Sequence, residues 1–314
     1  MKVLVIGVGA TGGLFAARFA SSGHAVTVIG RPAAVRSIRA DGLVVEDRTR
    51  MSVRVVAATT IPREGPFDLA LLTVKTFDVG RASADLARSR PDPLPTLLPQ
   101  NGLGIETVVR ASAVDAGWKD PGPWLVRAVH SIPATLLAPG RVRVGGEGEL
   151  LLPGAGPARV AADRFEELFR SAGFRVRRVP EFEREVWRKA LVNAAINPLS
   201  AVRGVPNGRL LEEPWRSEAL ALLGEAVAAA AAAGHRFSEE EARSDFERVA
   251  TATATNRSSM LQDLERGRPT EIEAISGALL EVGREHGLDL PATRAVRDEL
   301  LRRTAGRARP PQRS

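Results

Sequence analysis

Hydrophobic and polar positions follow two different patterns along the chain. Up to about residue 180, short β-branched apolar runs of strand length alternate with amphipathic runs of helical period. After Pro180 only helical patterns follow one another. This change predicts an α/β Rossmann-type N-terminal domain over residues 1–180 and an all-α C-terminal domain over residues 181–303.

The first pattern predicts a βα rhythm. We expect strands at residues 2–6, 25–29, 68–74, 96–99, 125–129 and 174–179, and helices at 14–20, 78–88, 105–111 and 158–170. Residues 132–152 contain short alternating runs broken by Pro139-Gly140 and Gly145-Gly146, which is typical of antiparallel strands.

The second pattern predicts helices at residues 183–196, 218–233 and 271–286, with a last helix opened by Pro291. Gly234 is expected to end a helix, and Ser238 and Thr270 are expected to cap the helices that follow them. Residues 304–314 are basic and contain proline, so we expect a disordered tail there.

Composition narrows the chemistry. The chain has no Cys, which excludes disulfides, thiolate metal sites and Cys nucleophiles. Its four His are scattered without the spacing of metal ligands, so no metal site is expected. The net charge of +7 comes from spread basic residues without a stacking platform of aromatics, which favours anionic small molecules over nucleic acid.

The N-terminal apolar run could be mistaken for a signal peptide. It contains Gly7, Gly9, Gly12 and Gly13 and then becomes amphipathic, so a strand, a turn and a helix explain it better. No apolar stretch elsewhere reaches the length of a membrane span. We therefore expect a cytoplasmic protein with no membrane partner.

Gly7, Gly9 and Gly12 have the G-x-G-x-x-G spacing and stand between the first strand and the first helix. In a βαβ unit this placement lets the backbone approach a pyrophosphate at the helix N-terminus. A glycine-rich turn kept for packing alone is the other interpretation. The motif predicts a dinucleotide cofactor.

The end of the second strand distinguishes NADPH from NADH. Sites for NADH usually carry a carboxylate there for the ribose 2′-hydroxyl, whereas this chain has Arg31. Lys75, at the end of a later strand, could reach the same region. Two cations suit a 2′-phosphate, so we predict NADPH/NADP as the cofactor.

In the helical half, Lys189, Asn193 and Asn197 recur at every fourth position of an otherwise apolar helix. This spacing places all three polar heads on one face. Pro198 follows directly, so we expect the helix to kink or end at Asn197. A snorkelling lysine with two asparagines joining helices would produce the same pattern. The stretch alone leaves both interpretations open.

Three further positions could carry chemistry. Asn101 follows a strand at the edge where doubly wound sheets present ligand contacts, although it also suits a turn. Ser259 lies in a polar segment before Gly267. Glu271 opens a predicted helix, where a carboxylate is often only a partner of the helix dipole.

Five motifs together resemble the ketopantoate reductase (2-dehydropantoate 2-reductase) family along nearly the whole chain. They are GVGATG at 7–12, TVK at 73–75, QNGLG at 100–104, WRKALVNAAINPLSA at 187–201 and SSMLQDLERGRPTEIEAISG at 258–277. The resemblance implies a Rossmann domain, a helical domain and an active cleft between them. Val144, where the family pattern favours His, departs from it, as does the basic tail.

By matching motif, the resemblance gives Lys189 the role of general acid and Glu271 the acidic position beside the substrate. It makes Asn101, Asn193, Asn197 and Ser259 substrate-binding residues, with Asn101 also near the nicotinamide. Gly7, Gly9, Gly12, Arg31 and Lys75 become cofactor-binding residues.

The predicted function is therefore NADPH-dependent reduction of 2-dehydropantoate to pantoate, which in this family feeds pantothenate and coenzyme A synthesis. An ammonium suits this chemistry because it stabilises the developing alkoxide and then supplies the proton. Two alternatives stay open: a reductase of another short 2-oxo or 3-hydroxy acid, and a non-catalytic NADPH-binding sensor. A homodimer is compatible with the apolar helical faces.

Overall fold

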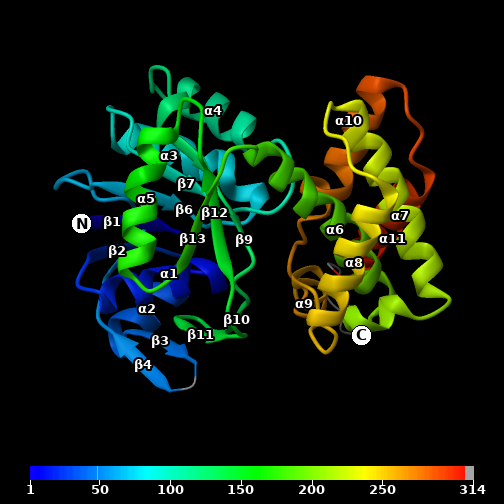
Figure 1. Ribbon diagram of the computed structural model, residues 1–314. Coiled ribbons are helices and arrows are strands. Elements are labelled where there is room, and N and C mark those ends of the chain that lie inside the picture. The colour runs from blue at the N-terminus through cyan, green and yellow to red at the C-terminus, as the bar shows by residue number, and fades with distance from the viewer. Residues whose placement is uncertain (48, 308–314) are drawn as a thin grey trace, which may run out of the picture. The chain divides into compact units, whose positions relative to one another are not determined.

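The computed structural model describes residues 1–47 and 49–307, and the chain divides into two compact units (Figure 1). The first unit comprises Met1–Gln100 and Ile105–Phe182. The second comprises Asn101–Gly104 and the chain from Glu183 onward. The change of hydrophobic pattern at Pro180 lies close to the point between Phe182 and Glu183 where the chain passes from the first unit to the second. The hydrophobic pattern does not predict that residues 101–104 belong to the second unit.

A parallel sheet of six strands forms the centre of the first unit, in the order β5-β2-β1-β6-β7-β8. Its strands are β1 (Lys2–Ile6), β2 (Ala25–Ile29), β5 (Val56–Ala58), β6 (Leu69–Leu72), β7 (Thr96–Leu98) and β8 (Leu125–Arg127). Numbered along the chain, these strands have the Rossmann order 3-2-1-4-5-6. The order reverses between β1 and β6, so the segments that follow these two strands meet at the carboxyl edge, where such sheets bind ligands.

Helices and two smaller sheets surround this sheet. The helices are α1 (Ala10–Ser21), α2 (Pro32–Asp41), α3 (Val79–Ser89), α4 (Ile105–Asp115) and α5 (Arg159–Ser171), with 3-10 turns at Thr76–Asp78 and Gly122–Trp124. One smaller sheet joins β10 (Ala134–Ala138), β11 (Arg141–Val144), β3 (Leu43–Glu46) and β4 (Arg50–Val53). The other joins β13 (Arg175–Val179), β12 (Glu149–Pro153) and β9 (Val129–His130).

Aromatic side chains fix α1 against α5. Phe15 and Phe19 of α1 meet Phe169 of α5 edge to face, with ring centroids 4.9 and 5.0 Å apart. All three rings are fully buried. Such contacts add about 0.5–1.5 kcal/mol per pair to the area that they bury. This packing fixes the axis of α1, whose N-terminus follows the glycine-rich turn.

Most strands and helices predicted for the first unit are confirmed, but two predictions needed correction. Residues 32–58 contain α2 and β3 to β5, which local apolar patterns did not reveal because each of these strands has only three or four residues. Residues 132–152 are not wholly antiparallel. β10 pairs antiparallel with β11, but β11 pairs parallel with β3 and β12 pairs parallel with β13. Alternation of polarity along one strand does not reveal the direction of its partner.

Among residues 183–307 the second unit contains helices and no strand, as the sequence predicts. They are α6 (Phe182–Arg203), α7 (Trp215–Ala232), α8 (Glu239–Ala252), α9 (Ser259–Glu265), α10 (Ala278–His286) and α11 (Pro291–Arg307), with a 3-10 turn at Asn207–Leu211. Ser238 caps α8 as predicted, its Oγ accepting the Glu241 amide at 3.0 Å. Fully buried alanines of α7 let neighbouring helices approach closely.

Helix α6 does not end at Asn197. It continues past Pro198 to Arg203, so of the two predicted outcomes at Asn197, a kink or an end, the end is wrong. Pro198 removes only the N–H that would reach the Ala194 carbonyl. The apolar residues on both sides of it, including Ala195 and Leu199, are fully buried, and tertiary packing outweighs the lost hydrogen bond.

The disorder predicted from residue 304 onward is wrong for residues 304–307. Residues 304–307 continue α11, and the Thr304 hydroxyl donates to the Leu301 carbonyl at 2.8 Å. The basic composition of this stretch is compatible with a helix anchored by the buried Leu300 of its preceding turn. Residues 308–314, the rest of the predicted tail, lie outside the described residues.

The helix predicted at residues 271–286 is two elements. A π-helical turn, η4 (Glu273–Gly277), precedes α10, and Glu271 lies just before this turn. Thr270 caps no helix here, because η4 begins after Ile272 without a side-chain cap. Propensity does not reveal a π-turn, since it differs from an α-turn only by one inserted residue.

No helix among the described residues combines the length and the apolar character needed to cross a bilayer.

Ion pairs join α6 to α8 next to Lys189. Arg188 donates to Glu241 at 2.6 Å and to Asp245 at 2.9 Å, and Arg184 donates to Glu241 at 2.8 Å. The side chain of Asp245 is only 12% exposed. These partly buried pairs hold α8 against the helix that carries the predicted polar face.

We predict that Arg188→Met lowers the free energy of unfolding by about 1–3 kcal/mol, because Asp245 and Glu241 then lose a charged donor at a partly buried site. Urea unfolding followed by circular dichroism measures the change. Arg284→Met is the matched control, since Arg284 pairs with Glu281 on an exposed face of α10, and it should have no measurable effect. Equal losses in the two variants would contradict the structural role of Arg188.

Candidate active site

The glycine-rich turn after β1 is built by close backbone contacts. Gly7 has φ +105°, and a Cβ there would lie 2.6 Å from the Val74 amide nitrogen. A Cβ on Gly12 would collide with the Gly7 carbonyl and the Thr73 side chain. The Thr73 hydroxyl donates to the Gly7 carbonyl at 2.6 Å. These two glycines therefore let the turn pack on the end of β6.

Gly9 differs from its neighbours, because a Cβ there would meet nothing within 4 Å. It is the N-cap residue of α1, and neither a side-chain cap nor an acidic residue occupies that helix start. A helix N-terminus with amide donors and open space above a glycine fits a pyrophosphate. This part of the first unit fits a dinucleotide cofactor.

Arg31 and Lys75 lie in the first unit, on two segments that an ion pair connects. Arg31 precedes α2 and has a side chain that is 86% exposed. Its guanidinium lies 3.4 Å from Asp78, whose amide in turn donates to the Lys75 carbonyl at 2.9 Å. The pairing of Arg31 with Asp78 was not foreseen, because the two residues are far apart in sequence.

Helix α6 carries Lys189, Asn193 and Asn197 among buried neighbours. Trp187, Leu191 and Ile196 are at most 6% exposed. Lys189 and Asn193 are half-buried, and Asn197 is buried. The helix runs unbroken through all three positions, so their spacing of four keeps them on one face.

The Asn193 side chain has a polar atom whose hydrogen bonding is incomplete. Its Nδ2 is buried and finds no hydrogen-bond acceptor among the described residues. Leaving such a donor unpaired costs about 1–3 kcal/mol. A ligand or ordered water that accepts from this amide would remove the cost.

Ser259 is presented at the start of α9. The preceding residue, Ser258, is the N-cap, and its Oγ accepts the Leu261 amide at 3.1 Å. Ser258 is buried, whereas Ser259 is exposed. The cap thus faces inward while the next hydroxyl is accessible to solvent.

Asn101 and Glu271 belong to segments that touch. Gly102 has φ +90°, and a Cβ there would collide with the Ala274 carbonyl in η4. The Leu103 amide donates to that same carbonyl at 3.2 Å. Glu271 is 8% exposed, and its carbonyl accepts from the Ala274 amide at 3.1 Å. The loop that carries Asn101 therefore packs on the turn that follows Glu271.

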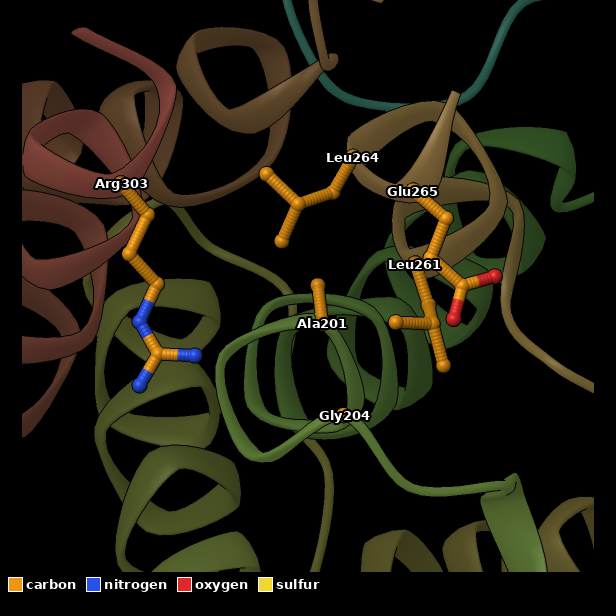
Figure 2. A pocket seen from close by; sticks show the side chains of 6 residues that line it. All are labelled: Ala201, Gly204, Leu261, Leu264, Glu265 and Arg303. Carbon is orange, nitrogen blue, oxygen red and sulfur yellow. The ribbon is translucent and has the colours of Figure 1, made fainter. Parts of the chain in front are cut away.

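Figure 2 shows a pocket of about 370 Å³ elsewhere in the second unit. It is lined by Ala201, Gly204, Leu261, Leu264, Glu265 and Arg303. No predicted site residue lines it. Glu265 pairs with Arg257, and Arg303 pairs with Glu299. Both charged groups of the lining are thus already engaged.

The predicted site residues fall into two groups. Asn101, Lys189, Asn193, Asn197, Ser259 and Glu271 all belong to the second unit, and Gly7, Gly9, Gly12, Arg31 and Lys75 to the first. Sequence reasoning did not single out Gln100, whose buried amide donates to the Leu72 carbonyl at 2.5 Å. It also passed over Asn207, a buried amide that donates to the Thr253 hydroxyl at 2.9 Å. Both are polar residues near apolar stretches of the sequence, and this was the only feature that could have indicated them.

Comparison with known proteins places this architecture in a family. A family model described as ketopantoate reductase PanE/ApbA matches residues 3–156, and its C-terminal counterpart matches residues 181–303. A 2-dehydropantoate 2-reductase from Archaeoglobus fulgidus is 33% identical over 94% of this chain and 95% of the relative. One from Halobacterium salinarum is 34% identical over 95% and 97%.

Solved structures agree. The crystal structure of a PanE/ApbA family ketopantoate reductase from Ralstonia eutropha JMP134 has a TM-score of 0.86 and 29% identity, covering 98% of this chain and 100% of that one. A D-mandelate dehydrogenase structure with NADH and anilino(oxo)acetate reaches a TM-score of 0.90 at 22% identity, covering 98% and 99%, which shows a shared fold only. From its two matched domains and its full-length relatives, this chain belongs to the ketopantoate reductase family.

Proposed function

We propose that this protein reduces 2-dehydropantoate to pantoate with NADPH. The family supplies the reaction class, and the relatives named 2-dehydropantoate 2-reductase supply the substrate. The observation that carries the proposal is the Asn193 amide nitrogen, which is buried and has no acceptor in the part of the chain that the structure describes, one helical turn from Lys189 and from Asn197. A polar face of this kind suits a ligand with several oxygens.

The proposed cofactor site uses the first unit. The turn at Gly7, Gly9 and Gly12 with the start of α1 would hold the pyrophosphate, as the space above Gly9 allows. Arg31 and Lys75 would bind the 2′-phosphate, which competes with Asp78 for the Arg31 guanidinium. When bound, NADPH supplies the hydride that reduces C2 of the 2-oxo acid.

The proposed substrate site uses the second unit. Asn101, Asn193 and Asn197 would bind substrate oxygens, since amides both donate and accept. Ser259, exposed at the start of α9, would donate its hydroxyl to the substrate carboxylate.

Lys189 is the proposed general acid. As hydride reaches C2, negative charge develops on the carbonyl oxygen, and the Lys189 ammonium stabilises it and then donates a proton to it. The products are a 2-hydroxy acid and NADP⁺, with Lys189 left neutral until it takes up a proton from water. The buried carboxylate of Glu271 is the proposed acidic group beside the substrate.

Two alternatives have distinct outcomes in one assay. A panel of short 2-oxo acids ranked by kcat/KM should place 2-dehydropantoate first. A higher value for another acid would favour a related reductase. Binding of NADPH without turnover of any acid would favour a cofactor-binding sensor. A cytoplasmic location and a homodimer stay predictions from the sequence.

We predict that Lys189→Ala lowers kcat for NADPH oxidation with 2-dehydropantoate at least about 10²-fold, the usual contribution of a general acid. Lys189→Arg separates charge from proton donation, because a guanidinium keeps the charge but does not give up a proton at neutral pH. It should keep part of the charge stabilisation and lose the proton donation, so its kcat should lie between those of the wild type and the Ala variant. Lys119→Ala, an exposed lysine in the first unit, is the control. Wild-type rates in Lys189→Ala would eliminate this mechanism.

For the cofactor, Arg31→Ala should lower kcat/KM for NADPH about tenfold, the size of a lost charge-assisted hydrogen bond. The value for NADH should change little, because it lacks the 2′-phosphate. Steady-state kinetics with both cofactors measures the ratio. Arg36→Ala, exposed on α2, serves as control. A parallel fall for NADPH and NADH would show that Arg31 does not recognise the phosphate.

A further inference from the structure

Two buried hydroxyls connect α6 to the start of α9. Ser200 is fully buried and Ser258 is 5% exposed. Their Oγ atoms are 2.7 Å apart. Ser200 lies three residues after Asn197 on α6, and Ser258 lies directly before Ser259. The contact thus joins the two segments that carry these proposed substrate-binding residues.

The surrounding hydrogen bonds assign one proton to each hydroxyl. Ser258 Oγ accepts the Leu261 amide at 3.1 Å, and Ser200 Oγ lies 3.2 Å from the Asn197 carbonyl, which can only accept. All three contacts are satisfied when Ser200 donates to Asn197 and Ser258 donates to Ser200. The result is one directed relay from the Leu261 amide to the Asn197 carbonyl.

We propose that Ser200 and Ser258 are positioning residues whose relay holds Ser259 in register with Asn197 and so sets the affinity for the 2-oxo acid. The proposal rests on the proposed function for its substrate. Neither hydroxyl touches the substrate: Ser200 is fully buried, and the Ser258 Oγ is committed to the cap and to Ser200. The relay acts through Ser259, which is exposed on the next residue.

The burial of the relay gives it this importance. Removing the Ser200 hydroxyl leaves the Ser258 proton without its acceptor, and removing the Ser258 hydroxyl leaves the Leu261 amide without its cap, next to the buried residues Leu199 and Met260 of the same two segments. The start of α9 can then shift so that the unpaired group forms a hydrogen bond with water. An exposed N-cap such as Ser238 on α8 has water available when its hydroxyl is lost.

The test compares Ser200→Ala, Ser258→Ala and the double variant in the full-length protein at saturating NADPH. Each single variant should raise KM for 2-dehydropantoate about tenfold, from the cost of one buried hydrogen bond, with kcat within about threefold. The double variant should match the single ones, because either change breaks the same relay. Ser258→Thr keeps a capping hydroxyl and should restore KM.

Ser238→Ala is the matched control, since it removes an N-cap of the same unit away from Ser259. It should lower thermal stability without raising KM. If Ser238→Ala raises KM as much as Ser258→Ala, or if the two relay variants multiply in their effects, the positioning role is overturned.

Amide hydrogen exchange gives a readout that needs no substrate. Ser200→Ala should speed exchange of the Leu261 amide, which Ser258 accepts, and leave the Glu241 amide of α8 unchanged. Unchanged exchange at Leu261 overturns the relay. Faster exchange at Leu261 in a protein whose wild type does not turn over 2-dehydropantoate supports the relay and rejects the proposed function instead.

Discussion

The burial of α6 is the constraint on which the second unit depends. This helix contributes fully buried apolar side chains to the core and also carries a cation and two amides at every fourth position. Each buried polar group on this helix needs a hydrogen-bond partner. An unpaired one costs about 1–3 kcal/mol, which is a large fraction of a typical net stability of about 5–15 kcal/mol. Lys189 has a partner, whereas the amide nitrogen of Asn193 has none among the described residues. The helix thus combines core packing with a polar face on which one buried amide nitrogen finds no partner among the described residues.

The first unit separates packing from binding in a comparable way. Gly7 and Gly12 are required by close backbone contacts, so they would be glycines whatever the turn bound. Gly9 has no such contact, and its lack of a side chain keeps space open. The one glycine without a packing reason is therefore the strongest sign of a cofactor in this turn.

Much of this could be read from the sequence, for identifiable reasons. Apart from the edge strand β5, the strands of the parallel sheet are buried on both faces, so their apolar runs are continuous and easily recognised. The strands within residues 32–58 are only three or four residues long, and local pattern did not reveal them. The motif of α6 was visible because its spacing is local. The pairing of Arg31 with Asp78, the link between Ser200 and Ser258, and the membership of residues 101–104 in the helical unit depend on contacts distant in sequence.

The π-turn before α10 has a consequence for how Glu271 can be oriented. One additional residue in a helical turn rotates everything before it by about 100° relative to everything after it. The apolar face of α10, which includes Leu279, packs into the core. The Glu271 carboxylate before the π-turn can therefore point in a direction that does not follow from the position of this face. In a regular α-helix, the packing of the apolar face would fix the direction of the Glu271 side chain as well. The inserted residue therefore makes the orientation of the Glu271 carboxylate independent of the packing of α10.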